Sequence, residues 1–314
     1  MKHLLTLLLL IAVSCGTQHK SSTEEASKET ASQEFRGRTM RRSIEDISTI
    51  SSPAEYEDMV ARYWDDFDFN CGERVAQYDT VDIIYAMSDY VAIIPPQRAD
   101  SLLRSLMLRA STSREVLDFF SKVAEIVLHN PNSPMRNDEY YIPILEVLVE
   151  SPLLDEYDRM VPAYDLDVVS KNRLGTTAND FVYTLSNGSS GRLSNIQADY
   201  TILMFSNPGC PMCSEITEKL SSSPLINELG ELGRIKILTI YPDADLEAWR
   251  EYLRQMPHQW INAYDKGMVI TEKRLYNLNA IPSLYLLDKD KRVIIKDGVS
   301  VEQIENAIAL LEVQ

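Results

Sequence analysis

Apolar residues recur at three- and four-residue spacing through the first half of the chain, the pattern of amphipathic helices. This spacing predicts helices over residues 55–69, 78–92, 97–109, 113–129 and 138–150. The segment 55–69 is rich in aromatic residues (Tyr63, Trp64, Phe67 and Phe69), which we interpret as core. No strand-like alternation precedes residue 170, so residues 53–165 are predicted to form an all-α domain.

The pattern changes near residue 178. Short apolar or alternating runs predict strands at 181–185, 200–205, 235–241, 283–287 and 292–296, and helical periodicity predicts helices at 214–230, 246–255 and 301–311. The run at 200–205 is continuously apolar, as expected of a central strand buried on both faces. Strands that alternate with helices and end in a hairpin and a helix predict an α/β sandwich over residues 175–314.

The N-terminal residues differ from both domains. Lys2 precedes an apolar run from Leu4 to Val13, which is shorter than the roughly 20 residues that span a bilayer. Residues 1–14 are therefore interpreted as a secretory signal peptide. Residues 15–52 are polar, cannot bury enough apolar surface to offset their ordering entropy, and are predicted to form a flexible tether.

Length and charge narrow the class of protein. A chain of 314 residues is long enough for two domains of about 150 residues each. Its formal net charge of −16 argues against a nucleic-acid partner, which requires a basic surface for phosphates. After the signal peptide, no stretch offers about 18 uninterrupted apolar residues, so no transmembrane helix is expected.

The chemistry is predicted at Cys210-Pro211-Met212-Cys213, which falls directly between a predicted strand and a predicted helix. The free N–H groups and the dipole at a helix N-terminus favour a thiolate at Cys210. Pro211 suits the first turn, where its missing N–H costs nothing. Cys213 lies one turn further on the same face, where it can close a disulfide with Cys210 and resolve a mixed disulfide.

Three rival interpretations of this cysteine pair are weaker. A static disulfide is uncommon in a strand–helix setting, and a structural zinc site would need four ligands, whereas only Cys71, His129 and His258 remain, far apart in sequence. A peroxidase would need a nearby Thr and Arg that the sequence does not supply. Thiol exchange itself requires no metal or organic cofactor. Cys71 is interpreted as a buried or idle thiol, with pairing between chains or to Cys210 as alternatives.

Several features together resemble the thioredoxin superfamily, in particular its extracytoplasmic thiol–disulfide oxidoreductases. They are the opening strand at Asp180-Phe181, the turn at Asn187-Gly188, the strand before Cys210, and Ile281-Pro282 at the start of a later strand. The resemblance implies that Pro282 is cis and lies against the redox pair. It also implies that the backbone of Ile281 pairs with an extended substrate, beside Pro211 and Met212.

The sequence departs from that family at three positions. Gly209 stands where Trp commonly precedes the first cysteine, and Met204 stands where thioredoxin carries a buried aspartate. Ile216 occupies the position at which some reductases carry a glutamate. No proton acceptor for the buried cysteine can therefore be carried over from the family.

Two further resemblances concern the N-terminal half. Ala12-Val13-Ser14-Cys15 resembles a bacterial lipobox, which implies a lipidated, palmitate-bearing Cys15, and Gly16 favours sorting to an outer membrane facing the periplasm. The segment 63–69 resembles the start of a helical domain of unknown function found in Bacteroidota-type lipoproteins.

The sequence thus predicts a lipid-anchored thiol–disulfide oxidoreductase of the cell envelope. Its expected partners are the thiols or disulfides of envelope proteins and a protein that donates or accepts electrons. The alternative is a redox-inactive thioredoxin fold that serves as a binding module or envelope interaction protein. Whether the pair reduces, oxidises or isomerises depends on its reduction potential.

Overall fold

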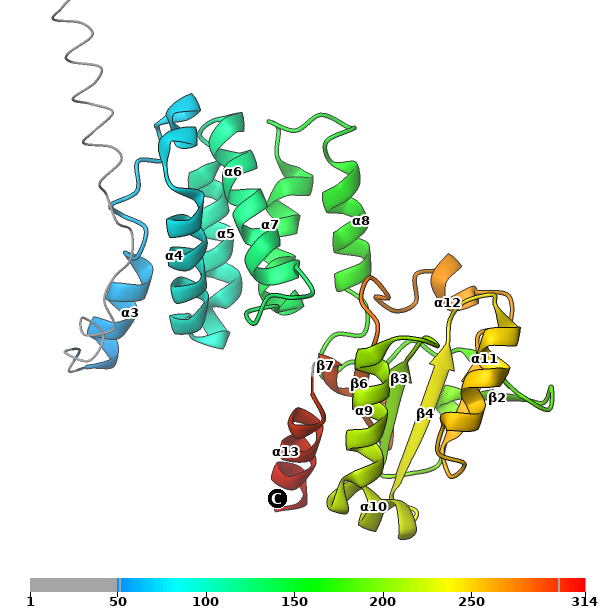
Figure 1. Cartoon of the computed structure of the whole chain (residues 1–314). Helices are drawn as coiled ribbons and strands as arrows, with labels where there is room; N and C mark the ends of the chain where they lie inside the picture. Colours follow the sequence, from blue (N-terminus) through cyan, green and yellow to red (C-terminus); the bar gives the residue numbers. More distant parts are fainter. Residues whose placement is uncertain (1–49, 51, 299, 314) are drawn as a thin grey trace, which may run out of the picture.

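The computed structural model describes residues 50, 52–298 and 300–313, and in it a helical domain precedes an α/β domain (Figure 1). The signal peptide, Cys15 and nearly all of the tether predicted from the sequence lie outside the described residues. The helices of the first domain are α3 (Pro53–Ala61), α4 (Thr80–Ile93), α5 (Ala99–Ala110), α6 (Arg114–Ala124), α7 (Asp138–Glu150) and α8 (Met160–Val169). Short 3-10 turns span Gly72–Gln77 and Pro96–Arg98, and a π-helical turn, Glu125–His129, continues α6.

Polar side chains fix where several of these helices begin. The side chains of Asp79, Ser113 and Asn137 accept hydrogen bonds from backbone N–H groups in the first turns of α4, α6 and α7. Each satisfies a donor that has no partner within its helix. The helix predicted over 55–69 is only partly correct, because α3 ends at Ala61 and the following residues form turns.

The turns after α3 exist because their aromatic side chains pack into one core. Trp64 and Phe67 are buried and lie edge-on against Phe120 of α6, with ring centroids 5.3 and 4.9 Å away. A continued helix would turn some of these side chains away from the core, so tertiary packing outweighs the local helical periodicity. The interpretation of this cluster as core is confirmed.

The second domain is built on a seven-stranded mixed sheet with the order β2-β1-β5-β4-β3-β6-β7. The strands are β1 (Val182–Leu185), β2 (Ser190–Arg192), β3 (Tyr200–Phe205), β4 (Ile235–Tyr241), β5 (Ile261–Tyr264), β6 (Ser283–Asp288) and β7 (Val293–Gly298). β3 pairs parallel to β4 and antiparallel to β6. β3 and β4 have the predicted bounds, whereas β5 and α8 were not predicted.

The helices of this domain are α9 (Pro211–Ser222), α10 (Pro224–Glu231), α11 (Leu246–Tyr252), α12 (Val269–Glu272) and α13 (Val301–Glu312). The single helix predicted over 214–230 is in fact two, α9 and α10. Pro224 disfavours helical backbone at Ser223, and the Ser223 hydroxyl caps the second helix by accepting from Ile226 N–H.

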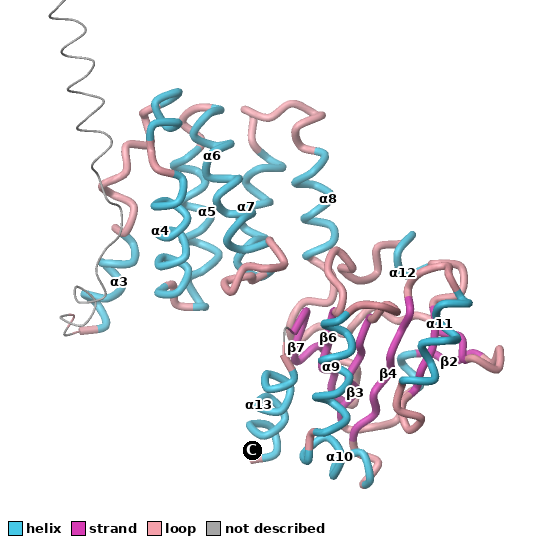
Figure 2. Tube along the Cα trace, viewed as in Figure 1, coloured by secondary structure: helices cyan, strands magenta, loops and turns pink. Residues whose placement is uncertain are grey.

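Alternate residues of the central strands supply two separate cores. Ile202 and Met204 of β3 point to the face covered by α9, α10 and α13, whereas Leu203 and Phe205 point to the opposite face. Figure 2 shows α9 and α13 lying along the sheet. This arrangement holds α9 with its first turn at the carboxyl end of β3.

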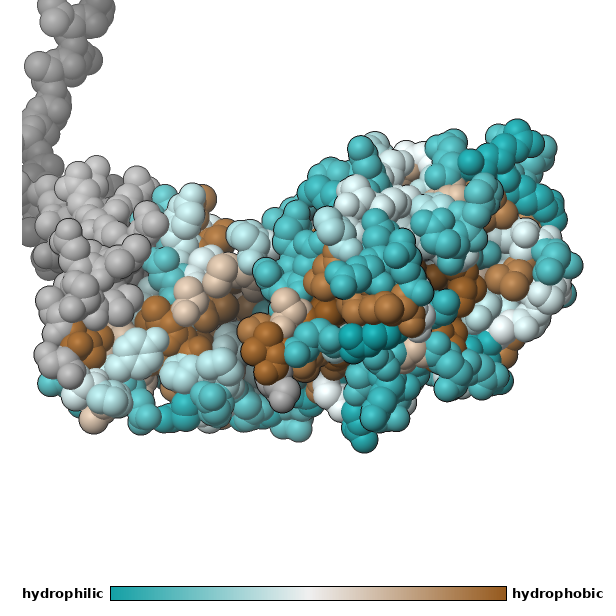
Figure 3. All heavy atoms as spheres, turned by 90° about the horizontal axis from the view of Figure 1, so that it is seen from below, coloured by the Kyte–Doolittle hydropathy of each residue, from teal (hydrophilic) through white to brown (hydrophobic). Residues whose placement is uncertain are grey.

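The two domains meet along β7 and the segment that follows α8. Ion pairs join the domains here, from Arg136 to Asp297, from Asp138 to Lys296 and from Glu139 to Arg173. A groove of about 590 Å³ runs beside the junction, and its apolar lining includes Leu174, Ile294, Ala307 and Leu310. Figure 3 shows the molecule from below, with hydrophobic side chains gathered near the middle of that face.

Replacing Trp64 by Ala should destabilise the helical domain. The side chain is 2% exposed and contacts several rings, so its removal leaves a cavity that costs about 3–5 kcal/mol. Urea unfolding followed by circular dichroism would measure the loss. Tyr157→Ala, at a site 79% exposed, is the control and should change stability by less than about 0.5 kcal/mol. Equal stability of the two variants would contradict this packing.

Candidate functional site

The cysteine motif lies where β3 passes into α9. Gly209, with φ of +72°, lets the chain turn sharply after β3, and α9 begins at Pro211. Cys210 is the N-cap residue, and its Sγ accepts a hydrogen bond from the backbone N–H of Cys213 at 3.2 Å. A sulfur that accepts from a helix N-terminus is placed where negative charge is stabilised.

Cys213 lies one turn into α9 and is fully buried beneath Cys210. Its side chain belongs to the apolar core that α9, α13 and the sheet share. Burial, with a smaller contribution from the neighbouring Cys210, raises the pKa of Cys213 to about 12. Both cysteines are free thiols in the structure, so their disulfide stays a prediction.

The segment around Pro282 lies against this pair, as the resemblance implies. The Ile281–Pro282 peptide bond is cis. The Sγ of Cys210 lies 3.7 Å from the carbonyl oxygen of Ile281, to which the thiol donates. Ser283, which follows Pro282, pairs with Phe205 at the end of β3. The sheet register therefore brings together two segments that are 71 residues apart in sequence.

Access to the two thiols is unequal. Pro211 and Met212 are exposed, Met212 to 54% of its surface, and Cys210 is half-buried between them and Ile281. Cys213 has no exposed surface. An approaching molecule can thus reach the sulfur of Cys210 but not that of Cys213. The predicted roles of these residues in substrate binding stay predictions.

Sequence reasoning missed the residues that support the motif from the loop after β4 and from α11. Asn207 donates through Nδ2 to Asp243 at 3.0 Å and so ties the loop before Cys210 to the end of β4. Tyr252 of α11 packs into the same core as Cys213. Burial raises the pKa of Tyr252, and contact with Thr217 on α9 lowers it. Asp243 and Tyr252 stand in no sequence motif, so only the fold reveals them.

Cys71 lies apart from this site. It is buried in the core of the helical domain, a hydrophobic cluster separate from that of Cys213. Burial raises the pKa of the Cys71 thiol, and the nearby Asp68 adds to the effect. Among the described residues, no group of three or more His, Cys, Asp or Glu side chains is placed to hold a metal ion.

Family models match both halves of the chain. A model described as a domain of unknown function (DUF5106) matches residues 14–172, which is more than half of the chain, and one described as thioredoxin-like matches residues 197–293. The fold, together with a helix that carries two cysteines at its N-terminus, defines the second half as a thioredoxin-like domain. The chain belongs to the DUF5106 family, with its helical domain preceding that thioredoxin-like domain.

Several known proteins are similar to this chain. A thioredoxin-like protein from Bacteroides caccae is 37% identical, has a TM-score of 0.77, and the match covers 84% of this chain and 95% of that one. The C-terminal domain of an uncharacterised Bacteroides fragilis protein is 46% identical over 44% of this chain and 98% of its own, with a TM-score of 0.43. Nucleoredoxin from Bos taurus is 29% identical over 114 residues, 36% of this chain. The chain spans about a quarter of that curated relative, at 26%.

The buried position of Cys213 predicts selective alkylation of the reduced protein. Burial raises the pKa of Cys213 far above that of an ordinary thiol, so little of it is thiolate at pH 8, and its side chain is also inaccessible. Iodoacetamide should therefore label Cys210 well before Cys213 or Cys71, as peptide mass mapping would show. Denatured protein, in which all three react, is the control. Equal labelling of Cys210 and Cys213 in native protein would contradict the geometry.

Proposed function

We propose that this protein is a thiol–disulfide oxidoreductase of the cell envelope that exchanges disulfides with partner proteins through Cys210 and Cys213. The observation that carries the proposal is the unequal placement of the two sulfurs. One is half-buried at the start of α9, and the other is buried one turn below it. A pair so placed can react with a partner in two separate steps.

In the reducing direction, the Cys210 thiolate attacks one sulfur of a partner disulfide. The partner's S–S bond breaks, its second sulfur leaves as a thiolate and takes a proton, and a mixed disulfide with Cys210 forms. Cys213 then loses its proton and attacks Cys210, which releases the partner as a dithiol and leaves a Cys210–Cys213 disulfide. Two electrons pass from the pair to the partner, and an envelope electron donor must return them. The oxidising direction is the reverse.

The groups around the pair support these steps. The backbone N–H of Cys213 donates to the Cys210 sulfur and so stabilises negative charge on it. The half-buried Ile281 and the exposed Met212 lie on either side of Cys210, where an extended partner chain would pass. No metal or organic cofactor takes part in this chemistry. The reduction potential of the Cys210–Cys213 pair decides the direction of the reaction. A potential of about −270 mV favours a reductase, and one of about −120 mV favours an oxidase.

Single cysteine variants test the proposal. Cys210→Ser should abolish reduction of insulin disulfides, because no nucleophile then reaches the partner, while Cys213→Ser should accumulate mixed disulfides that are visible on non-reducing gels. Cys71→Ser is the matched control, since Cys71 lies in the other domain's core, and it should retain activity. If the wild-type protein reduces insulin disulfides no faster than Cys210→Ser does, the chain is the redox-inactive binding module instead.

The location of the protein is the second part of the proposal. Cys15 follows an apolar leader and is proposed to carry the lipid that anchors the protein to a membrane, on the periplasmic side of the outer membrane. Among the described residues, no helix is long and apolar enough to cross a membrane. The polar residues between Cys15 and α3 would act as the tether.

Cys15→Ser should release the protein from the membrane fraction. The lipid would supply the membrane affinity, since acyl chains contribute about 0.8 kcal/mol per buried CH₂. Labelled palmitate incorporation and fractionation of producing cells would measure both effects, with Ser14→Ala as the neighbouring control. If the Cys15→Ser protein carries no label but still associates fully with the membrane, the lipid-anchor proposal is wrong. The redox proposal is unaffected by that result.

A further inference from the structure

Strand β7, at the junction of the two domains, is irregular. Its pairing with β6 runs from Leu287↔Val293 through Leu286↔Ile295 to Leu284↔Gly298, so the register shifts twice and extra residues lie on β7. Asp297 falls in the second shift and has a φ of +48°, in the left-handed region. Such bulges re-aim side chains, and they are frequent beside functional sites.

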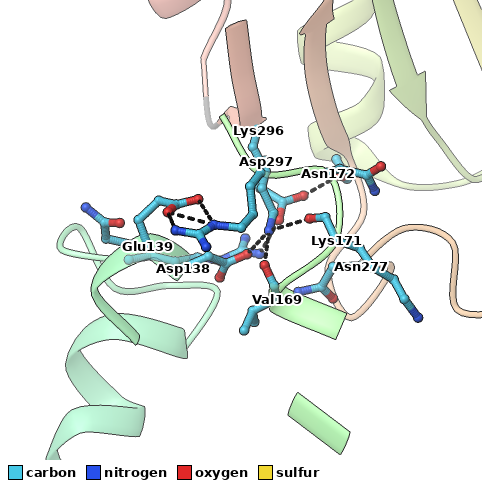
Figure 4. Close-up of polar contacts among 12 residues, drawn as sticks. Asp138, Glu139, Val169, Lys171, Asn172, Asn277, Lys296 and Asp297 are labelled. Atoms are coloured by element: carbon cyan, nitrogen blue, oxygen red, sulfur yellow. Dashed lines mark hydrogen bonds and ion pairs between the residues drawn. The ribbon is translucent and has the colours of Figure 1, made fainter. Parts of the chain in front are cut away.

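The bulge turns two consecutive side chains toward the helical domain, as Figure 4 shows. Lys296 forms an ion pair with Asp138 at 2.8 Å, and Asp297 accepts a hydrogen bond from Arg136 at 3.0 Å. In a regular strand these neighbours would point to opposite faces. The Lys296 ammonium also donates to the carbonyl oxygen of Val169, at the end of α8, at 2.6 Å.

The carboxylate of Asp297 continues this contact toward the redox pair. Its second oxygen accepts from the Ser283 hydroxyl at 2.7 Å. Ser283 directly follows Pro282, and the carbonyl of Ile281 faces the Cys210 sulfur at 3.7 Å. A single carboxylate thus joins a side chain of the helical domain to the segment 281–283 that borders Cys210.

Burial makes this carboxylate depend on Arg136. The Asp297 side chain is 8% exposed; burial raises its pKa, and the Arg136 charge lowers it. Removal of one partner from a buried ion pair leaves the other charge uncompensated, which costs more than the pair contributes. Lys296 also lowers the pKa of Asp297, but it contributes less than Arg136. Loss of Arg136 therefore favours movement of Asp297 toward water or its protonation, and either change would weaken its bond to Ser283.

We propose that Arg136 and Asp297 are positioning residues through which the helical domain braces the segment 281–283 beside Cys210. The helical domain then acts as part of the redox site's framework and sets how well an extended disulfide-bearing peptide is held there. This inference rests on the proposed function, because it assigns the brace to substrate recognition at that same site.

A second ion pair provides the matched control. Arg173, in the segment after α8, pairs with Glu139 of α7, the helix that begins with Asp138. The Arg173 side chain is 47% exposed and bonds to Glu139, and it forms no hydrogen bond or ion pair with Asp297 or Ser283. Arg173→Ala therefore removes a charged contact at the same junction without touching the brace.

Hydrogen exchange tests the brace without any use of activity. In Arg136→Ala, amides within residues 281–287 should exchange about tenfold faster than in the wild type, since the segment loses its anchor. Arg173→Ala should leave them unchanged, and Arg136→Lys, which keeps the cation, should restore most of the protection. Equal exchange in Arg136→Ala and Arg173→Ala would overturn the proposal. Asp297→Asn provides a second variant that keeps the fold's shape if Arg136→Ala unfolds.

Kinetics test the consequence for the substrate. For a disulfide-bonded peptide, Arg136→Ala and Asp297→Asn should raise KM at least about fivefold with little change in kcat, because the loss is in positioning. The rate with 5,5′-dithiobis(2-nitrobenzoate), which has no peptide backbone to align, should change less than about twofold. Equal effects on both disulfides would overturn the role in recognition. If the wild-type protein reduces neither disulfide, the proposed function is overturned. The hydrogen-exchange measurement would still test whether Arg136 and Asp297 brace the segment 281–283.

Discussion

The seating of α9 on the sheet is the interaction on which the site depends. Cys213, Ile216 and Leu220 recur along one face of the helix and are buried against β3, β4 and β6. Burial of this stripe fixes the axis of α9, so the first turn, whose N–H groups have no partner within the helix, falls at the end of β3. Cys210 is half-buried in this position, because the first turn projects beyond the buried stripe at the edge of the core.

The same packing separates the two thiols chemically. Cys213 is held in an apolar core, where the charged form of a thiol is costly, and burial raises its pKa to about 12. Cys210 sits at the rim, where the backbone N–H of Cys213 donates to its sulfur. One element therefore provides both an accessible sulfur and a protected one, which is the division of labour that the proposed exchange reaction needs.

The helical domain contributes charged side chains to the framework of the redox site. Its own core of aromatic and aliphatic side chains is independent of the sheet. The contact between the domains is instead polar and largely buried, with Lys296 paired to Asp138 and Asp297 to Arg136. Buried pairs of this kind add little net stability but permit few alternative geometries, so they suit an interface that must hold one orientation.

The sequence by itself determined the local features, because these depend on near neighbours in the chain. Apolar periodicity predicted the helix over 138–150 and the strands over 200–205 and 235–241 with the bounds that the structure has. The position of the cysteine motif between a predicted strand and a predicted helix was also correct. Tertiary structure alone decided the rest. Residues 62–67 form turns despite their helical pattern, because their aromatic side chains pack into the core. The β7 bulge places Asp297 where it bonds to Arg136, 161 residues away, and to Ser283, 14 residues away. Such contacts leave no periodic trace, since their partners are chosen by the packing of whole elements.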